Sequence, residues 1–158
     1  MVTNCDVDNA LWADQPPNDW IPHPTIRDLN QVYCSGEYYP YKFGTLNFLR
    51  TPYNPPQDCT WLFTAPPGRK IIFKFRNAWF GYNCTKECAC RDYLEIRDTE
   101  DMTNRGYRFC CYVRPKRGIF VSQSNKMLVI SRIHNSGSRG FFAYAYLAPE
   151  NATSGYFN

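Results

Sequence analysis

The sequence predicts an all-β fold, an antiparallel β-sandwich, and two observations indicate it. Short runs in which apolar and polar residues alternate, as in a strand with one buried face, recur from residue 70 onward. Clusters of Gly, Asn, Ser and Asp separate these runs, and no stretch has the periodicity of a long amphipathic helix. Short strands punctuated in this way are typical of a sandwich or a barrel.

Five runs are expected to form strands. In the clearest one, 71–76, the residues at 71, 73 and 75 would face a core while Lys74 and Arg76 face water. Four similar runs follow, at 92–97, 118–121, 127–130 and 141–146.

Residues 1–33 differ from the rest of the chain. They are rich in Pro, Asn and Asp and have neither strand nor helix periodicity, so we interpret them as an irregular N-terminal extension. Trp12, Trp20 and Cys5 indicate that this extension is not wholly disordered, because they offer burial and a covalent tether. A chain of 158 residues suits one domain with a single core.

Cysteine usage indicates an oxidising compartment. Eight cysteines in so short a chain are unusual in the cytosol and form an even set that suits pairing. Two glycosylation sequons begin at Asn83 and Asn151 and favour the same compartment. No apolar run approaches the roughly 20 residues of a membrane helix, so we expect any membrane anchoring to come from parts absent from this chain. The expected location is secreted, or the extracellular side of the plasma membrane.

Charge gives a weaker indication. The net charge is +4, and the dense basic groups are 69–70 and 114–117. Such a balance more often solubilises a surface than binds nucleic acid, which we do not expect as a partner. A sulfated glycan is a possible partner for these groups.

Six segments carry a resemblance to a known family, and they occur in the family's order and spacing. The segments are Cys34-Ser35-Gly36, Cys59-Thr60-Trp61, Ala65-Pro66-Pro67-Gly68, the run Asp92-Tyr93-Leu94-Glu95-Ile96-Arg97-Asp98, Gly106-Tyr107-Arg108-Phe109-Cys110 followed by Pro115, and Gly140-Phe141-Phe142-Ala143.

With these segments the sequence resembles a CUB domain, the extracellular sandwich module of complement proteases, developmental metalloproteases and many receptors. The resemblance implies a jelly-roll type β-sandwich over 34–148, preceded by the extension 1–33 that Cys5 tethers and followed by a tail, 149–158. It also implies protein binding and no catalysis. The chain accordingly has no His-Glu-x-x-His and no Gly-x-Ser-x-Gly motif.

The resemblance also implies two disulfides. They pair Cys34 with Cys59 and Cys90 with Cys110, although Cys88 sits about equally close to the position taken by Cys90. Because adjacent residues on a strand point to opposite faces, we expect Cys110 and the next cysteine to have different partners. Two additional bridges, one of which pins the extension, would then use Cys5, Cys84, Cys88 and Cys111.

Zinc is the alternative for this group, since closely spaced thiolates can surround a metal. The ligands would be Cys84, Cys88 and Cys90 with Cys110 or Cys111. We favour disulfides, because the eight cysteines can all pair in an oxidising compartment.

Many CUB domains bind calcium through one Glu and two Asp, and the resemblance implies that this chain has lost that site. Asp92 keeps the middle position. Gly81 stands near the expected Glu, and His134 stands where the last Asp belongs. Calcium needs several hard oxygen ligands, so we expect no metal and no cofactor. Asp92 would then cap backbone amides or pair with an arginine.

The same end of the sandwich contains a group of aromatic residues that we regard as a candidate partner-binding site. The alternative for Trp79 and Phe80 is that they complete the core. A second aromatic group holds the extension or faces a partner, and it consists of Tyr38, Tyr39, Tyr41 and Phe43. The candidate site consists of Trp79, Phe80, Tyr82 and His134.

Three functions are considered. The favoured one is an extracellular, non-catalytic protein-binding module for adhesion or receptor assembly. The second is a secreted glycan- or heparin-binding protein, which would use Arg69, Lys70, Arg114, Lys116 and Arg117. The third is an accessory domain of a larger extracellular protease.

Overall fold

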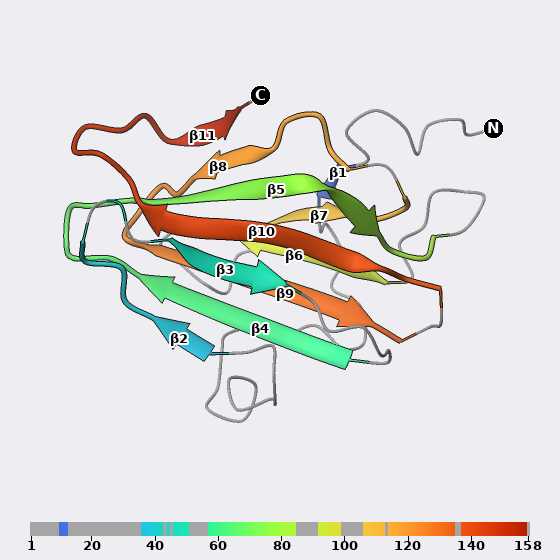
Figure 1. Ribbon diagram of the computed structural model, residues 1–158. Helices are drawn as coiled ribbons and strands as arrows, with labels where there is room; N and C mark the ends of the chain where they lie inside the picture. The colour runs from blue at the N-terminus through green and yellow to red at the C-terminus, as the bar shows by residue number, and fades with distance from the viewer. Residues whose placement is uncertain are drawn as a thin grey trace.

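Two β-sheets pack face to face in the computed structural model, and the strand β10 passes in front of β6 and β7 in Figure 1. The described residues contain no helix, so the predicted all-β sandwich is confirmed. The structure describes residues 10–12, 36–42, 44, 46–50, 57–84, 92–98, 106–112, 114–134 and 137–157.

The first sheet has six strands in the order β1-β7-β6-β9-β4-β2. The contact between β2 and β4 is parallel, and the other pairs are antiparallel. The bounds of these strands are Ala10–Trp12 (β1), Gly36–Tyr38 (β2), Gln57–Thr64 (β4), Tyr93–Arg97 (β6), Tyr107–Phe109 (β7) and Lys126–Ile133 (β9).

The second sheet has five strands in the order β11-β8-β5-β10-β3, all antiparallel. Their bounds are Asn47–Arg50 (β3), Ile71–Gly81 (β5), Ile119–Val121 (β8), Gly140–Leu147 (β10) and Gly155–Phe157 (β11).

Along the first part of β5, buried and exposed side chains alternate as predicted. Ile71, Phe73 and Phe75 are 0%, 0% and 3% exposed, whereas Lys74 and Arg76 point away from the core. The Phe73 ring packs edge to face on Phe75 and on Phe120 of β8, with centroids 5.2 Å and 5.8 Å apart. Aromatic pairs in this geometry add to the stabilisation that burial provides. Each of the five predicted runs overlaps a strand of the structure.

The extension, which we expected to be irregular, and the tail both contain a strand. Each contributes one strand, since β1 pairs with β7 and β11 pairs with β8. A strand of three residues is too short to show a period-two pattern, and its backbone pairing comes from the neighbouring strand.

The outward positions of β6, and those of β9 after its first residue, are buried, including the acidic residue Glu95. Glu95 is 1% exposed and binds Arg97 at 2.8 Å and Arg108 at 2.9 Å. Burial alone would raise the pKa of Glu95, but the charges and hydrogen bonds of the two arginines outweigh it and hold the pKa below its ordinary value. A buried carboxylate is tolerated here because it is doubly paired.

Gly106 allows the chain to approach β6 closely, and this predicts a strong effect of substitution. A Cβ atom at this position would lie 1.8 Å from the carbonyl oxygen of Ile96, and backbone cannot move aside cheaply. Gly106→Ala should lower the free energy of unfolding by about 3 kcal/mol or more, as measured by urea denaturation. Gly118→Ala is the matched control, because its nearest neighbour would be 3.6 Å away in the Phe75 ring. Equal effects of the two substitutions would contradict the packing described here.

Candidate functional site

Asp92 organises the end of the sandwich at which we expected a candidate site. Its side chain is 0% exposed. Atom Oδ1 accepts a hydrogen bond from the backbone N–H of His134 at 2.9 Å, and Oδ2 accepts one from the Ser138 hydroxyl at 2.6 Å. The backbone N–H of Asn83 donates to the same hydroxyl oxygen at 2.9 Å. Asp92 therefore joins three chain segments. It also caps a backbone amide, which is one of the two structural roles that we expected for it.

The expected glutamate position has no room for a side chain. A Cβ atom on Gly81 would lie 2.8 Å from a ring atom of Tyr112 and 3.1 Å from the Arg139 side chain. The Gly81 carbonyl also accepts the backbone N–H of Arg139 at 2.7 Å. At the third position, the His134 side chain is 46% exposed. Of the three positions that would bind calcium, Gly81, Asp92 and His134, one therefore has a carboxylate. Both oxygens of that carboxylate, on Asp92, accept hydrogen bonds.

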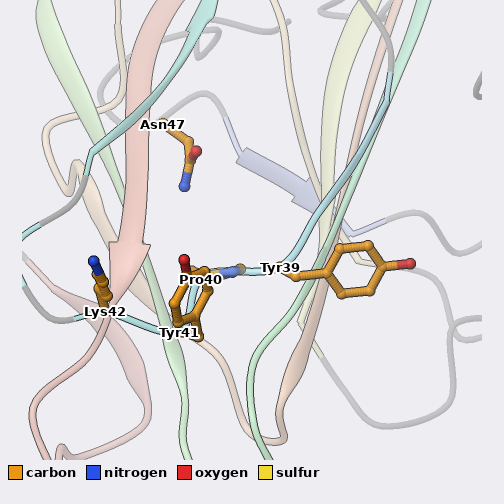
Figure 2. Close-up of a pocket in the computed structure, with 5 residues that line it drawn as sticks. All are labelled: Tyr39, Pro40, Tyr41, Lys42 and Asn47. Atoms are coloured by element: carbon orange, nitrogen blue, oxygen red, sulfur yellow. The ribbon is translucent and has the colours of Figure 1, made fainter.

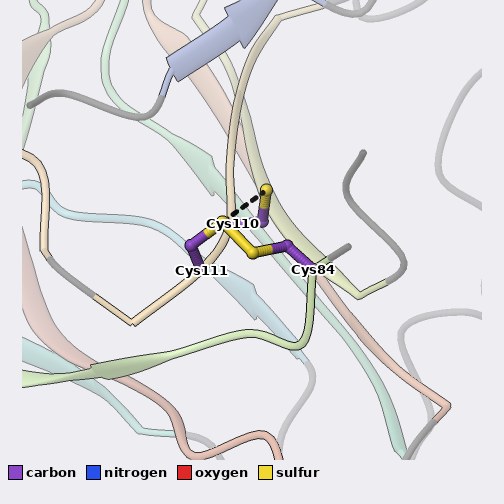
Figure 3. Close-up of side chains that lie close together, drawn as sticks. All are labelled: Cys84, Cys110 and Cys111. Atoms are coloured by element: carbon purple, nitrogen blue, oxygen red, sulfur yellow. Dashed lines mark hydrogen bonds between the residues drawn. A yellow bond between two sulfur atoms is a disulfide. The ribbon is translucent and has the colours of Figure 1, made fainter. Parts of the chain in front are cut away.

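Three cysteines gather beside this network, as Figure 3 shows. Cys84 and Cys111 form a disulfide with a Cα–Cα distance of 5.2 Å, and the Cys110 sulfur lies 3.8 Å from the Cys111 sulfur. Within the described ranges this is the one group of three metal-ligating side chains. Cys110 is disulfide-bonded as well, and a sulfur in a disulfide is not a thiolate ligand. These three cysteines are therefore structural and do not form a zinc site.

The remaining bridges are described in part. Cys59 and Cys110 are disulfide-bonded, and no described cysteine is free. The pairs predicted for them involve Cys34 and Cys90, which lie outside the described residues and stay predictions. The same holds for the additional cysteines Cys5 and Cys88.

Cys110 and Cys111 have different disulfide partners, as expected, but their side chains do not lie on opposite faces. Strand alternation would place the two side chains on opposite faces, but their sulfurs lie 3.8 Å apart. The reason is that β7 ends at Phe109 and Cys111 has φ 70°, in the left-handed region that glycine favours. The resemblance places glycine at this position in the family. Here Cys111 is held by its disulfide and by two backbone hydrogen bonds with Tyr82, at 2.7 Å and 2.8 Å.

Two of the four residues of the candidate partner-binding site lie in the core, which corrects the expected site. Phe80 and Tyr82 are both 0% exposed. The strand alternation of β5 breaks at 76–79, opposite an irregularity in the pairing with β10, so Phe80 returns to the core. The Tyr82 hydroxyl lies 2.8 Å from the Ser131 hydroxyl oxygen, and burial raises the pKa of Tyr82 well above its ordinary value.

Trp79 does remain at the surface, where it meets two residues that the sequence analysis did not identify. The Arg139 guanidinium lies 5.8 Å from the Trp79 ring and 5.7 Å from the Tyr112 ring. Trp79 and Tyr112 are 38% and 44% exposed. We call Trp79, Tyr112 and Arg139 the Trp79 cluster. No local pattern marks Tyr112 or Arg139, because they meet only in the folded chain. Arg139 reaches Trp79 through the pairing of β5 with β10. Tyr112 does so through the bridge between Tyr82 and Cys111.

Hydrogen bonds fix the Trp79 cluster to the backbone. The indole N–H of Trp79 donates to the carbonyl oxygen of Arg139 at 3.2 Å, and the Tyr112 hydroxyl donates to the carbonyl oxygen of Gly137 at 3.1 Å. The cluster therefore presents an exposed cation between two aromatic rings in a fixed arrangement.

The five basic glycan-binding candidates fall into two groups with partly structural roles. Arg69 and Lys70 donate to the carbonyl oxygens of Ala148 and Ala152 at 2.7 Å and 3.0 Å. The other group lies beside the middle of β5, since the carbonyl oxygen of Gly118 accepts the N–H of Phe75. In that group Arg114 donates to the carbonyl oxygen of Asn77, and Lys116 and Arg117 are exposed.

Two members of the second aromatic group, Tyr39 and Tyr41, line a shallow pocket of about 140 Å³ (Figure 2). Tyr39 and Tyr41 are 61% and 71% exposed, whereas Tyr38 stacks on Phe63 of the core at 5.1 Å. Phe43 lies outside the described residues. A pocket of this volume is below the usual range for small-molecule sites. The residues that line it are Tyr39, Pro40, Tyr41, Lys42 and Asn47.

The sequence profile of the CUB domain matches residues 34–146. The chain belongs to the CUB domain family. CUB domains are non-catalytic modules that occur in extracellular or secreted proteins and mediate protein–protein interactions. No helix in the described part of the chain is long and apolar enough to cross a membrane.

Curated relatives include nematode metalloproteinases. The chain is 39% identical over 93 residues to zinc metalloproteinase dpy-31 of Brugia malayi, covering 59% of this chain and 15% of that protein. It is 37% identical over 95 residues to zinc metalloproteinase nas-36 of Caenorhabditis briggsae, covering 60% of this chain and 15% of that protein. The chain thus spans a small part of these proteins, and the match covers their CUB region and not the protease domain.

Solved CUB structures share the fold. The MASP-1 CUB2 domain bound to Ca2+ superposes with a TM-score of 0.55 at 20% identity, covering 72% of this chain and 99% of that chain. The extracellular region of zebrafish Gpr126/Adgrg6 gives 0.53 at 19% identity, covering 70% of this chain and 14% of that chain.

Calcium should not stabilise this CUB domain. A micromolar site in millimolar calcium would add about 4 kcal/mol to the free energy of unfolding, so its effect on a melting curve would be plain. We expect equal melting temperatures in 1 mM calcium and in chelator at fixed ionic strength. Asp92→Ala should destabilise the domain by about 2 kcal/mol in both buffers, because it leaves buried donors unpaired. A rise in melting temperature with calcium that Asp92→Ala abolishes would refute this prediction.

The left-handed backbone at Cys111 predicts a difference between two variants that both lack its disulfide. Loss of the bridge in Cys84→Ser/Cys111→Ser should cost about 2–4 kcal/mol. Cys84→Ser/Cys111→Gly should be more stable than that variant by about 1 kcal/mol, because glycine adopts a positive φ without penalty. Chemical denaturation with the other disulfides intact measures both. Equal stability would show that the backbone conformation at residue 111 carries no cost.

Proposed function

We propose that this chain is a calcium-independent protein-binding module of an extracellular protein. Its family supports the binding role, since CUB domains are non-catalytic and mediate protein–protein interactions. Independence from calcium is supported by Gly81, where neighbouring side chains fill the space of a ligand, and by the hydrogen-bonded carboxylate of Asp92.

The Trp79 cluster is the observation that carries this proposal. Trp, Tyr and Arg are the residue types that contribute most to binding energy in protein interfaces. Here all three are exposed, and hydrogen bonds to backbone carbonyls hold Trp79 and Tyr112, the two rings near which the Arg139 guanidinium lies. A surface ordered before it binds loses less conformational entropy on association. The cluster occupies the end of the sandwich where the resemblance places the family's calcium-dependent docking loop.

The relatives support a more specific role as an accessory domain of a larger extracellular protease. Two of them are zinc metalloproteinases of which the matched region is 15%. In such an arrangement the module binds a substrate or a neighbouring protein while catalysis takes place elsewhere in the parent protein. Asn151 is exposed in a turn and stays a predicted glycosylation site, as does Asn83.

Glycan binding through the five basic candidates is less well supported. Three of these side chains donate to backbone carbonyls, and the two groups lie at different levels of β5. Residues 70 and 75 on a strand are roughly 16 Å apart, so the five cations do not form one cluster.

Capture of partners from extracellular extracts tests the proposed function. The full oxidised chain should retain a specific protein in chelator as well as in calcium. Trp79→Ala should reduce the amount retained about tenfold, as quantified by mass spectrometry, because a central aromatic anchor is lost. Lys116→Ala is the control, since it removes an exposed side chain outside the cluster. Retention that requires calcium, or that Trp79→Ala leaves unchanged, would argue against this function.

A further inference from the structure

The outer face of the five-stranded sheet is apolar where it should be polar. In an antiparallel sheet with one solvated face, the outward positions are usually polar. Along β10 the outward residues are instead Phe142, Tyr144 and Tyr146, each partly exposed between buried neighbours. The two tyrosine rings stack with centroids 5.8 Å apart.

The strand register extends this apolar face across the whole sheet. One cross-strand row joins all five strands, with neighbouring members directly paired. Neighbouring strands are about 4.8 Å apart, so the row is roughly 19 Å long. Its ends, Phe48 and Phe157, are 51% and 39% exposed. The row consists of Phe157, Ile119, Lys74, Tyr144 and Phe48.

Cations lie among these rings. The Arg76 guanidinium is 5.3 Å from the Phe48 ring and 5.2 Å from the Phe142 ring, and Lys74 pairs with Tyr144 in the row. A guanidinium that lies over aromatic rings keeps N–H groups at its edge, where they can bind a carboxylate in a bidentate manner. We call Phe48, Lys74, Arg76, Phe142, Tyr144 and Tyr146 the aromatic face.

Negative charge is absent from the sequence of this sheet. The five strands contain Arg50, Lys74 and Arg76 but no Asp or Glu, although the chain has 14 acidic residues. The outer face of the other sheet differs, since Leu128 and Ile130 are 0% and 2% exposed there. The aromatic face is therefore the exposed broad surface of the sandwich within the described residues.

We propose that the aromatic face is a docking surface for an acidic protein surface, one that presents carboxylates beside apolar side chains. This inference rests on the proposed protein-binding function and adds a second surface to the Trp79 cluster. Charge complementarity selects the partner, because carboxylates would meet Lys74 and Arg76 while apolar groups cover the rings.

Other occupants fit this surface less well. Two copies placed face to face would bring like charges together at Lys74 and Arg76. A sulfated glycan is bound chiefly by dense cations, whereas the aromatic face has four aromatic rings and two cations. A flat sheet surface also suits a macromolecule better than a small molecule.

A phage-displayed library of random 12-residue peptides, selected on the oxidised full chain, tests this surface. Enriched peptides should combine at least two Asp or Glu residues with aromatic or aliphatic ones. A selected peptide should bind about tenfold more weakly to Tyr144→Thr and to Arg76→Gln, and also more weakly as salt rises. Threonine keeps the β-propensity of the exposed strand position, and unchanged melting curves confirm that the variants fold.

Matched variants place the binding on one surface. Lys116→Gln and Tyr39→Ala remove an exposed cation and an exposed aromatic ring outside the aromatic face, and each should change the affinity less than twofold. Neutral or basic peptides, no enrichment, or insensitivity to both Tyr144→Thr and Arg76→Gln would overturn the inference. Weakening by Trp79→Ala alone would also overturn it, while leaving the proposed function intact.

The same variants also test whether a second copy of the chain or a sulfated glycan binds this face instead. Sedimentation velocity should show a monomer at micromolar concentration, and a dimer that Tyr144→Thr disrupts would assign the face to a second copy. Heparin binding lost in Arg76→Gln, without acidic peptides, would assign it to a sulfated glycan. Either result overturns the inference.

Discussion

The pairing of β5 with β10 is the constraint on which the rest of this structure depends. The register runs from Gly81 opposite Gly140 to Ile71 opposite Leu147, with one irregularity between Phe141 and Ala143. Inward positions of the two strands supply the aromatic core, and outward positions supply most of the aromatic face. The irregularity ends the alternation at 76–79 and exposes Trp79 before Phe80 returns to the core. One strand pair thus sets both candidate surfaces.

At the end of the sandwich, covalent and hydrogen-bonded contacts join the chain segments around Asp92. The Asp92 carboxylate accepts hydrogen bonds from an amide and a hydroxyl across three segments, and a disulfide joins Cys84 to Cys111 beside them. In the calcium-independent module that we propose, these contacts would order the loops in place of a cation. The surface next to them then presents Arg139, a positive charge, where a calcium-dependent module would rely on carboxylates.

Five strands were predictable from short apolar runs such as 71–76, whereas β2, β3 and β4 were not predicted. In β4 the inward residues Cys59, Trp61 and Phe63 do alternate along the strand, so its pattern was present in the sequence and was missed. The strands β1 and β11 are each three residues long. Their positions follow from backbone pairing with β7 and β8 and not from a pattern of apolar residues. At the site, Asp92 was identified through the family motif. Burial of Phe80 in the core was the alternative that the sequence offered, but the separation of exposed Trp79 from buried Phe80 and Tyr82 was not predictable, because a local irregularity reverses which face a residue takes.

The left-handed conformation at Cys111 links folding of this end to the chemistry of the compartment. A non-glycine residue with φ 70° is unfavourable in isolation, and here the disulfide to Cys84 helps to hold it. During biosynthesis the reduced chain would meet that penalty before any bond offsets it. Oxidation of the Cys84–Cys111 pair therefore offsets a backbone penalty at Cys111 that the reduced chain would bear without that bond.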